Sequence, residues 1–233
     1  MGYEITKDKA VYAVDTLKQS ATLTLQNIMP LLLAWVVSLA GPVVLLAIMA
    51  PVGALIDHAL GFRTAGLGTL VGLLIPGVMI GGFYAGWIYV CLKASRGQRI
   101  TKEDMFRPLD QMLSAFAVLV ITTVCCGLLS FTVVIPAFLF LKWQLAPYYI
   151  VDRGLGPIQA LKQSWSDTNP IFIQLAILDL ILFAAQFALG FTIFIPIFVH
   201  LALSVASAIV YTRWLPDSGR GELGKSNTSL SQR

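Results

Sequence analysis

The sequence predicts an all-α protein. We expect a polytopic membrane helical bundle with six transmembrane helices, arranged as three hairpins, and amphipathic helices on the cytoplasmic surface. The 233-residue chain is 57% hydrophobic and only 12% charged, about half the charged fraction of a soluble domain. Fifteen of the sixteen Lys and Arg residues fall into four short clusters. The apolar stretches between the clusters are long enough for spans, since one crossing takes about 20 residues.

The apolar stretches divide naturally into six spans. The stretch 112–151 holds only one charged residue, Lys142, and is too long for one helix. We therefore expect two spans there, with a turn near residues 127–132. The other spans are predicted at 28–50, 67–92, 171–189 and 194–212. This division gives a cytoplasmic amphipathic segment at 1–27, a transmembrane domain at 28–214 and a disordered cytoplasmic tail at 215–233.

The positive charges predict the orientation. The first cluster precedes span one, and the second lies between spans two and three. The third lies in span four and the loop after it, and the fourth follows span six. Only Arg63 falls on the opposite side. Cytoplasmic loops hold the Lys and Arg excess, so we expect both termini in the cytoplasm of a bacterial cell and the chain in its inner membrane. Because the positive charges flank spans, we expect no nucleic-acid partner.

The segments between spans carry helix signals. Thr101 and Asp104 form a capping-box pattern, and Pro157 suits the first turn of a helix. Near the N-terminus, apolar residues also follow helical spacing from Ala10 to Ala21. The tetrapeptide that starts at Leu17 recurs at Leu161. The pattern is a surface helix followed by a transmembrane hairpin, three times over.

One part of the chain resembles a known bacterial membrane family. The residues that carry the resemblance are Ala146-Pro147-Tyr148-Tyr149-Ile150-Val151-Asp152-Arg153-Gly154, then Ala160 to Trp165 and Asn169, with Ser95-Arg96-Gly97-Gln98-Arg99 upstream. They are similar to the YciC-type inner-membrane proteins and to the membrane domain fused to some glycerophosphoryl diester phosphodiesterases. The family usually has Pro-Gly and an Arg in span four, where this chain has Pro136-Ala137 and Lys142. The resemblance implies the fold but no particular activity.

Lys142 and Asp179 carry the strongest chemical signal. A charge inside a bilayer costs at least about 2.5 to 3.5 kcal/mol on insertion scales unless it is satisfied. Counted from the inner ends of their spans, both lie roughly 14–15 Å deep at 1.5 Å per residue. We therefore predict an intramembrane ion pair, which either fixes helix register or relays protons or ions. Gln144, Gln174, Gln186 and His200 would extend a polar network.

Span two carries six glycines in pairs four residues apart: Gly68 and Gly72, Gly77 and Gly81, Gly82 and Gly86. Small residues at this spacing let helices approach closely. We expect them to serve packing within the chain, with a dimer face or a solute path as alternatives.

The sequence predicts no catalytic residues, no cofactor and no metal site. His58 and His200 are the only histidines, and neither sits in a cluster of ligands. Residues 219–226 match the P-loop expression, but a P-loop also needs a strand before it and a helix after it. That context is missing from the predicted fold.

The function predicted from these features is non-catalytic. We expect an accessory or scaffold subunit of a membrane complex, or a factor in membrane homeostasis. Its partners would be the lipid bilayer and either another protein or a second copy within the membrane. The alternative is a transporter or channel for a small solute, ion or lipid that uses the Lys142–Asp179 pair.

Overall fold

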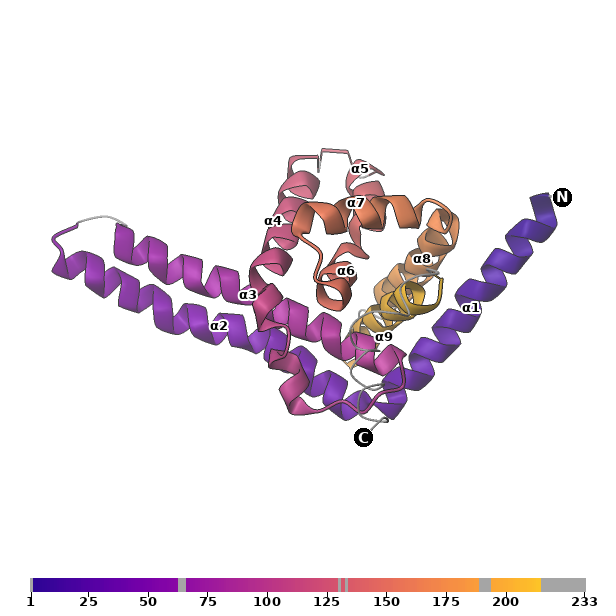
Figure 1. The fold of residues 1–233 in the computed structure, drawn as a ribbon, viewed down its shortest axis with the longest axis horizontal. Helices are drawn as coiled ribbons and strands as arrows, with labels where there is room; N and C mark the ends of the chain where they lie inside the picture. The colour runs from indigo at the N-terminus through magenta and orange to yellow at the C-terminus, as the bar shows by residue number, and fades with distance from the viewer. Residues whose placement is uncertain (1, 63–65, 130, 133, 189–193, 215–233) are drawn as a thin grey trace, which may run out of the picture.

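The computed structural model describes residues 2–62, 66–129, 131–132, 134–188 and 194–214, and most of them are helical (Figure 1). Side chains are described for these residues except 2–12, 186–188, 194–196 and 214. The described part of the chain has no strand, which confirms the predicted all-α class. The predicted tail at 215–233, including the P-loop-like segment, lies outside the described residues.

The elements follow one another along the chain with short connections. They are α1 (Gly2–Gln26), α2 (Ile28–Ala59), α3 (Leu67–Ser95), η1 (Lys102–Phe106), η2 (Leu109–Gln111), α4 (Met112–Leu128), α5 (Val134–Trp143), α6 (Ala146–Arg153), α7 (Pro157–Thr168), α8 (Phe172–Ala188), α9 (Phe194–Ile209) and η3 (Val210–Trp214).

Four stretches in the described residues are long and apolar enough to cross a membrane. They are α2, α3, Lys102–Leu128 and Val134–Arg153. A fifth span arises if α7 and the first part of α8 count together, although these helices are bent by 97°. The stretch Ile197–Arg213 is a shorter apolar helix. The chain therefore has the helices of a membrane protein, and the predicted number of six spans stays a prediction.

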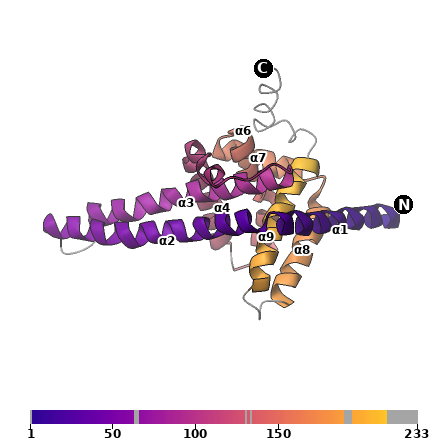
Figure 2. The same cartoon turned by 90° about the horizontal axis from the view of Figure 1, so that it is seen from below.

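Helices α2 and α3 pack along each other and form an arm that projects to the left in Figures 1 and 2. Glycines let the two backbones touch, because a Cβ at Gly53 or Gly68 would collide with the carbonyl oxygen of the other. A Cβ at Gly72 would likewise meet the carbonyl oxygen of Met49. Helix α2 continues past Pro51, beyond the predicted end of span one at residue 50.

The other helices pack around the inner half of the arm. Helix α4 contacts α3 and α5, while α8 and α9 contact each other and α1. The arm, α4 and the α8/α9 pair run in clearly different directions when Figures 1 and 2 are compared. Tyr149, Tyr211 and Leu92 are fully buried where α6, η3 and the end of α3 meet.

Proline explains why the predicted fourth span is broken into α5 and α6. Pro147 has no N–H, so the carbonyl of Trp143 cannot receive the helical hydrogen bond from four residues later. The chain turns at Gln144 and Leu145, and the N–H groups of Tyr148 and Tyr149 both bond to the Leu145 carbonyl. This break places Gln144 between two helices rather than within one.

The surface segments follow their local signals. The capping box of Thr101 and Asp104 is present, but it begins the short 3-10 helix η1 instead of a long amphipathic helix. Pro157 occupies the first turn of α7, as its position in the sequence predicts. The turn between α4 and α5 falls near the predicted residues 127–132, since α4 ends at Leu128 and α5 begins at Val134.

Candidate functional site

A cavity of about 380 Å³ lies between α2, α3, α4, α5, α6 and α9, and we call it the central cavity. Its wall is mainly apolar and aromatic, with a few polar groups. The lining residues are Trp35, Ser38, Leu39, Ile80, Tyr84, Trp87, Ile88, Leu119, Phe140, Gln144, Tyr148, His200, Leu203, Ser204 and Ser207. This composition and size are typical of small-molecule sites, which span about 300 to 1,000 Å³.

Several of the polar groups in the wall come from α6, α9 and the break between α5 and α6. Gln144 lies in the break between α5 and α6, and Tyr148 follows on α6, where its hydroxyl donates to the Ser204 carbonyl at 3.0 Å. His200 is held beside Trp35, with their ring centroids 6.3 Å apart. The hydroxyl of Ser204 donates to the His200 carbonyl at 3.1 Å, which leaves its oxygen able to accept a further bond.

Unpartnered polar atoms occur at Gln144, in the cavity wall, and at Asp179, on helix α8. The Gln144 Nε2 atom and both carboxylate oxygens of Asp179 are buried without a hydrogen-bond partner among the described residues. Asp179 interacts electrostatically with Gln144 and Tyr148, although Gln144 does not reach hydrogen-bond geometry. Burying a polar group without a partner costs free energy of folding. These atoms therefore indicate either a function or a partner that is missing from the described residues.

Lys142 has its partners on the other side of α5. Its ammonium group donates to Asn169 Oδ1 at 2.6 Å, and Lys142 as a whole residue is only 4% exposed. Its Nζ atom also lies 4.8 Å from the ring centroid of Phe172 and 5.7 Å from those of Phe138 and Trp165. Cation–π contacts and a charged hydrogen bond therefore satisfy this ammonium group.

The predicted Lys142–Asp179 ion pair is not formed in this structure. Lys142 donates to Asn169, and the two oxygens of Asp179 meet no donor among the described residues. The prediction compared only the depth of the two residues along their helices. It contained nothing about rotation around each helix axis, which points Lys142 toward α7. The two charged groups are therefore separate features.

The other predicted polar residues divide in the same way. Gln144 and His200 line the central cavity. Gln174 does not line it, and its buried Oε1 atom has no partner among the described residues. The side chain of Gln186 lies outside the described residues. No group of three or more His, Cys, Asp or Glu residues that could hold a metal ion occurs in the described part of the chain.

Five of the six glycines predicted to serve packing lie at close approaches. Gly68 and Gly72 contact α2, whereas Gly81, Gly82 and Gly86 contact the segment from Met105 to Met112. A Cβ at Gly77 would meet only the Phe116 ring, at 3.8 Å. Helix α3 thus uses its outer glycines against α2 and its inner ones against η1, η2 and α4.

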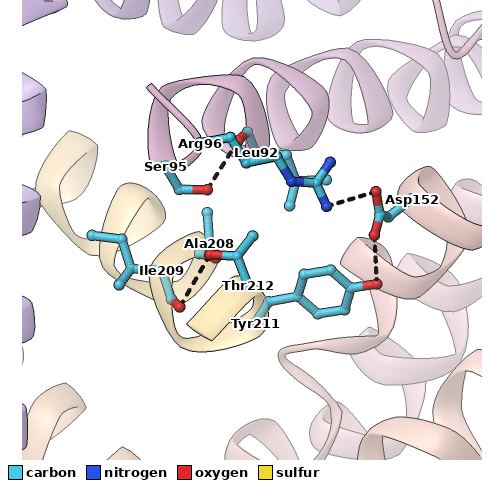
Figure 3. A network of polar contacts seen from close by, with 8 residues as sticks. All are labelled: Leu92, Ser95, Arg96, Asp152, Ala208, Ile209, Tyr211 and Thr212. Carbon is cyan, nitrogen blue, oxygen red and sulfur yellow. Dashed lines mark hydrogen bonds and ion pairs between the residues drawn. The ribbon is translucent and has the colours of Figure 1, made fainter. Parts of the chain in front are cut away.

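A buried charge cluster joins the ends of three elements, and we call it the polar end. Arg96 follows α3, Asp152 belongs to α6 and Tyr211 to η3 (Figure 3). Arg96 Nη2 lies 2.8 Å from Asp152 Oδ1, and the Tyr211 hydroxyl donates to Asp152 Oδ2 at 3.0 Å. Nearby, Lys93 pairs with Asp104 at 2.6 Å. These bonds hold α3, α6, η3 and η1 in a fixed arrangement.

The sequence does not reveal the polar end as a cluster. Lys93 and Arg96 belong there to the positive charges between spans two and three, and Asp152 belongs to the motif that resembles YciC-type proteins. Asp152 is 56 positions from Arg96 and 59 from Tyr211, so no local spacing in the sequence reveals these contacts. The signal in the sequence that could indicate the polar end is the presence of acidic residues, such as Asp104 and Asp152, among the basic residues at the ends of several spans.

Asp57 is a second residue that sequence reasoning missed. Its carboxylate accepts hydrogen bonds from the backbone N–H groups of Gly66, Gly68 and Thr69, at 2.7 to 2.8 Å. These N–H groups begin α3 and have no partners within that helix. Asp57, near the end of α2, therefore caps the start of α3 and closes the outer end of the arm.

A second hollow of about 480 Å³ lies beside the polar end. It is lined by Gln19, Leu23, Ser95, Arg96, Gly97, Gln98, Thr212 and Arg213. Arg213 donates to Gln19 Oε1 at 2.7 Å and so links η3 to α1. This hollow brings the N-terminal helix to the same end of the molecule as α3, α6 and η3.

Comparison with known proteins adds no relative. No family model, no curated protein and no solved structure matches the chain. The resemblance to YciC-type proteins stays a prediction from the motifs at 95–99 and 146–169.

Proposed function

We propose that the chain is a non-catalytic, multi-pass protein of the bacterial inner membrane that acts as a scaffold or accessory subunit. The observation that carries this proposal is the polar end, where Arg96, Asp152 and Tyr211 join three elements. Charged groups used in this way stabilise an arrangement of helices rather than act on a substrate. The arm formed by α2 and α3 then presents apolar side chains to the membrane and to a partner within it.

The proposed topology has six spans, as three hairpins, with both termini in the cytoplasm. The polar end supports it, because the predicted cytoplasmic ends of spans two, four and six are the ones that meet there. Helix α9 continues directly into η3, so that Phe194 to Trp214 would extend about 31 Å at 1.5 Å per residue. This length is sufficient for a sixth span.

Reporter fusions test the topology. A cytoplasm-active reporter fused after residue 214 should be active, and one inserted near Gly61 in the α2–α3 connection should be inactive. A periplasm-active reporter should give the opposite pattern. Activity of the periplasmic reporter at the C-terminal position would contradict the proposed orientation.

Photo-crosslinking tests the scaffold function. Val43 on the arm is 65% exposed, whereas Leu175 in α8 is fully buried. A photoreactive amino acid at position 43 should crosslink to another protein or to a second copy of the chain in intact membranes, and the same amino acid at position 175 should not. Crosslinks from position 43 only to lipid would contradict a protein partner on this face.

The central cavity favours a second candidate function, the transport or binding of a small membrane-soluble molecule. The Lys142–Asp179 pair, on which the sequence bases this function, is not among the described contacts. The cavity supplies a different basis, because Gln144 and His200 face a space of small-molecule size. Saturable binding of a solute that depends on residues in the cavity wall would support it.

A further inference from the structure

The wall of the central cavity is rich in aromatic residues. Trp35, Tyr84, Trp87 and Tyr148 come from α2, α3 and α6 and line the same space. The face of an aromatic ring carries partial negative charge and attracts cations, with the strongest attraction where water is excluded. Groups of such rings are the usual protein site for organic ammonium ions.

The electrostatic surroundings of the cavity also favour a cation. Among the residues that the structure describes, no Lys or Arg lines the cavity. The carboxylate of Asp179 acts on two wall residues, Gln144 and Tyr148, and both of its oxygens are buried without partners in the described residues. A positive ligand in the cavity would supply the counter-charge that the described residues do not provide.

The two other classes of ligand fit less well. An anion would need the ammonium group of Lys142, which is held by Asn169 and three aromatic rings away from the cavity. A neutral apolar molecule would leave the Asp179 carboxylate unpartnered. His200, the imidazole in the wall, can donate or accept a hydrogen bond in its neutral form without opposing a cation.

From these observations we propose that the central cavity binds a lipophilic organic cation, with its ammonium group near Tyr148 and Gln144 and its apolar part against the aromatic wall. Asp179 provides the counter-charge behind Gln144. This inference goes beyond the scaffold function and deepens the second candidate function, on which it rests, by naming the class of ligand.

Calorimetry with benzyltrimethylammonium on the purified full chain in detergent micelles tests the proposal. The wild-type protein should bind it saturably, with one ion per chain. Neopentylbenzene has the same shape without the charge, and it should bind at least about tenfold more weakly, a difference of about 1.4 kcal/mol. Equal binding of the two probes, or no saturable binding of the cation, would overturn the proposal.

Two variants with matched controls locate the site. Asp179→Asn should weaken binding of the cation by about tenfold, whereas Asp110→Asn, which removes an exposed carboxylate, should leave it unchanged. Trp35→Leu removes an aromatic face from the wall and should also weaken binding, whereas Trp143→Leu, which lies outside the wall, should not. If Asp179→Asn fails to fold, the Trp35 and Trp143 pair still decides.

Unchanged binding in a folded Asp179→Asn protein, or equal effects of Trp35→Leu and Trp143→Leu, would overturn the proposed site. Crosslinking from position 43 does not involve the cavity. Failure of cation binding would therefore leave the scaffold function standing, and failure of crosslinking would leave the cation site standing. Saturable binding of a neutral probe alone would support the second candidate function but not the cation.

Discussion

The polar end and the central cavity treat buried polar groups in opposite ways. At the polar end, Asp152 accepts hydrogen bonds from both Arg96 and Tyr211. At the cavity, Gln144 and Asp179 have atoms without partners in the described residues. The first arrangement fixes the helices, and the second leaves binding capacity unused. Polar groups that stabilise a fold and polar groups available to a ligand are thus separated within one small protein.

The largest effect should come from breaking the polar end. Asp152→Ala leaves Arg96 without its carboxylate and Tyr211 without its acceptor, in a buried setting. We expect a loss of about 3–5 kcal/mol in the free energy of unfolding, the usual cost of removing one partner of a buried pair. Reversible unfolding in mixed micelles measures it. Asp110→Ala, at an exposed carboxylate, should change stability by no more than about 0.5 kcal/mol. An equally small loss of unfolding free energy in Asp152→Ala would contradict the proposed role of the polar end in fixing the helices.

A smaller loss of stability should follow when the Lys142 ammonium group loses its hydrogen-bond acceptor, Asn169. Asn169→Ala removes the charged hydrogen bond to Lys142, which should cost about 1.5–3 kcal/mol. Asn27, between α1 and α2, is a matched control because its side-chain amide donates to the Leu23 carbonyl four residues earlier rather than to a charged group. Asn27→Ala should cost about 1 kcal/mol or less. Equal losses in the two variants would show that the bond to Lys142 has no special role.

Glycine substitutions on α3 sharpen the comparison within one helix. A Cβ at Gly86 would collide with the Met105 carbonyl, so Gly86→Ala should cost about 1–3 kcal/mol through overpacking. At Gly77 the added methyl group would meet only ordinary contacts. Gly77→Ala should therefore be neutral, or stabilise the helix by up to about 1 kcal/mol. Thermal unfolding of both variants in the same detergent measures the difference, and loss of stability in both would contradict this account of the packing.

The sequence predicted the features that depend on local pattern. Apolar runs located α2 and α3, the Thr101–Asp104 pattern located the capping box, and Pro157 located the start of α7. It also placed Lys142 and Gln144 correctly as polar residues within an apolar stretch. Pro147 is the residue in the sequence that signals the break between α5 and α6.

The sequence could not predict features that depend on the rotation and crossing of helices. Lys142 and Asp179 have similar depth, yet only the rotation of α5 decides that Lys142 meets Asn169. The contact of Asp152 with Arg96 joins residues 56 positions apart through the crossing of α3 and α6. The central cavity depends on six elements at once, so no single segment of sequence indicates it.

A double-mutant cycle between Lys142 and Asp179 tests the central claim most directly. The unfolding free energies of wild type, Lys142→Met, Asp179→Asn and the double variant would be measured in one detergent. We predict a coupling energy below about 0.5 kcal/mol, because the two groups do not pair. We also expect Asp179→Asn to lie within about 1 kcal/mol of wild type or to be more stable, since it removes an unpartnered buried charge. A coupling energy of about 2–3 kcal/mol, with strong destabilisation by Asp179→Asn alone, would contradict the separation of structural and binding groups.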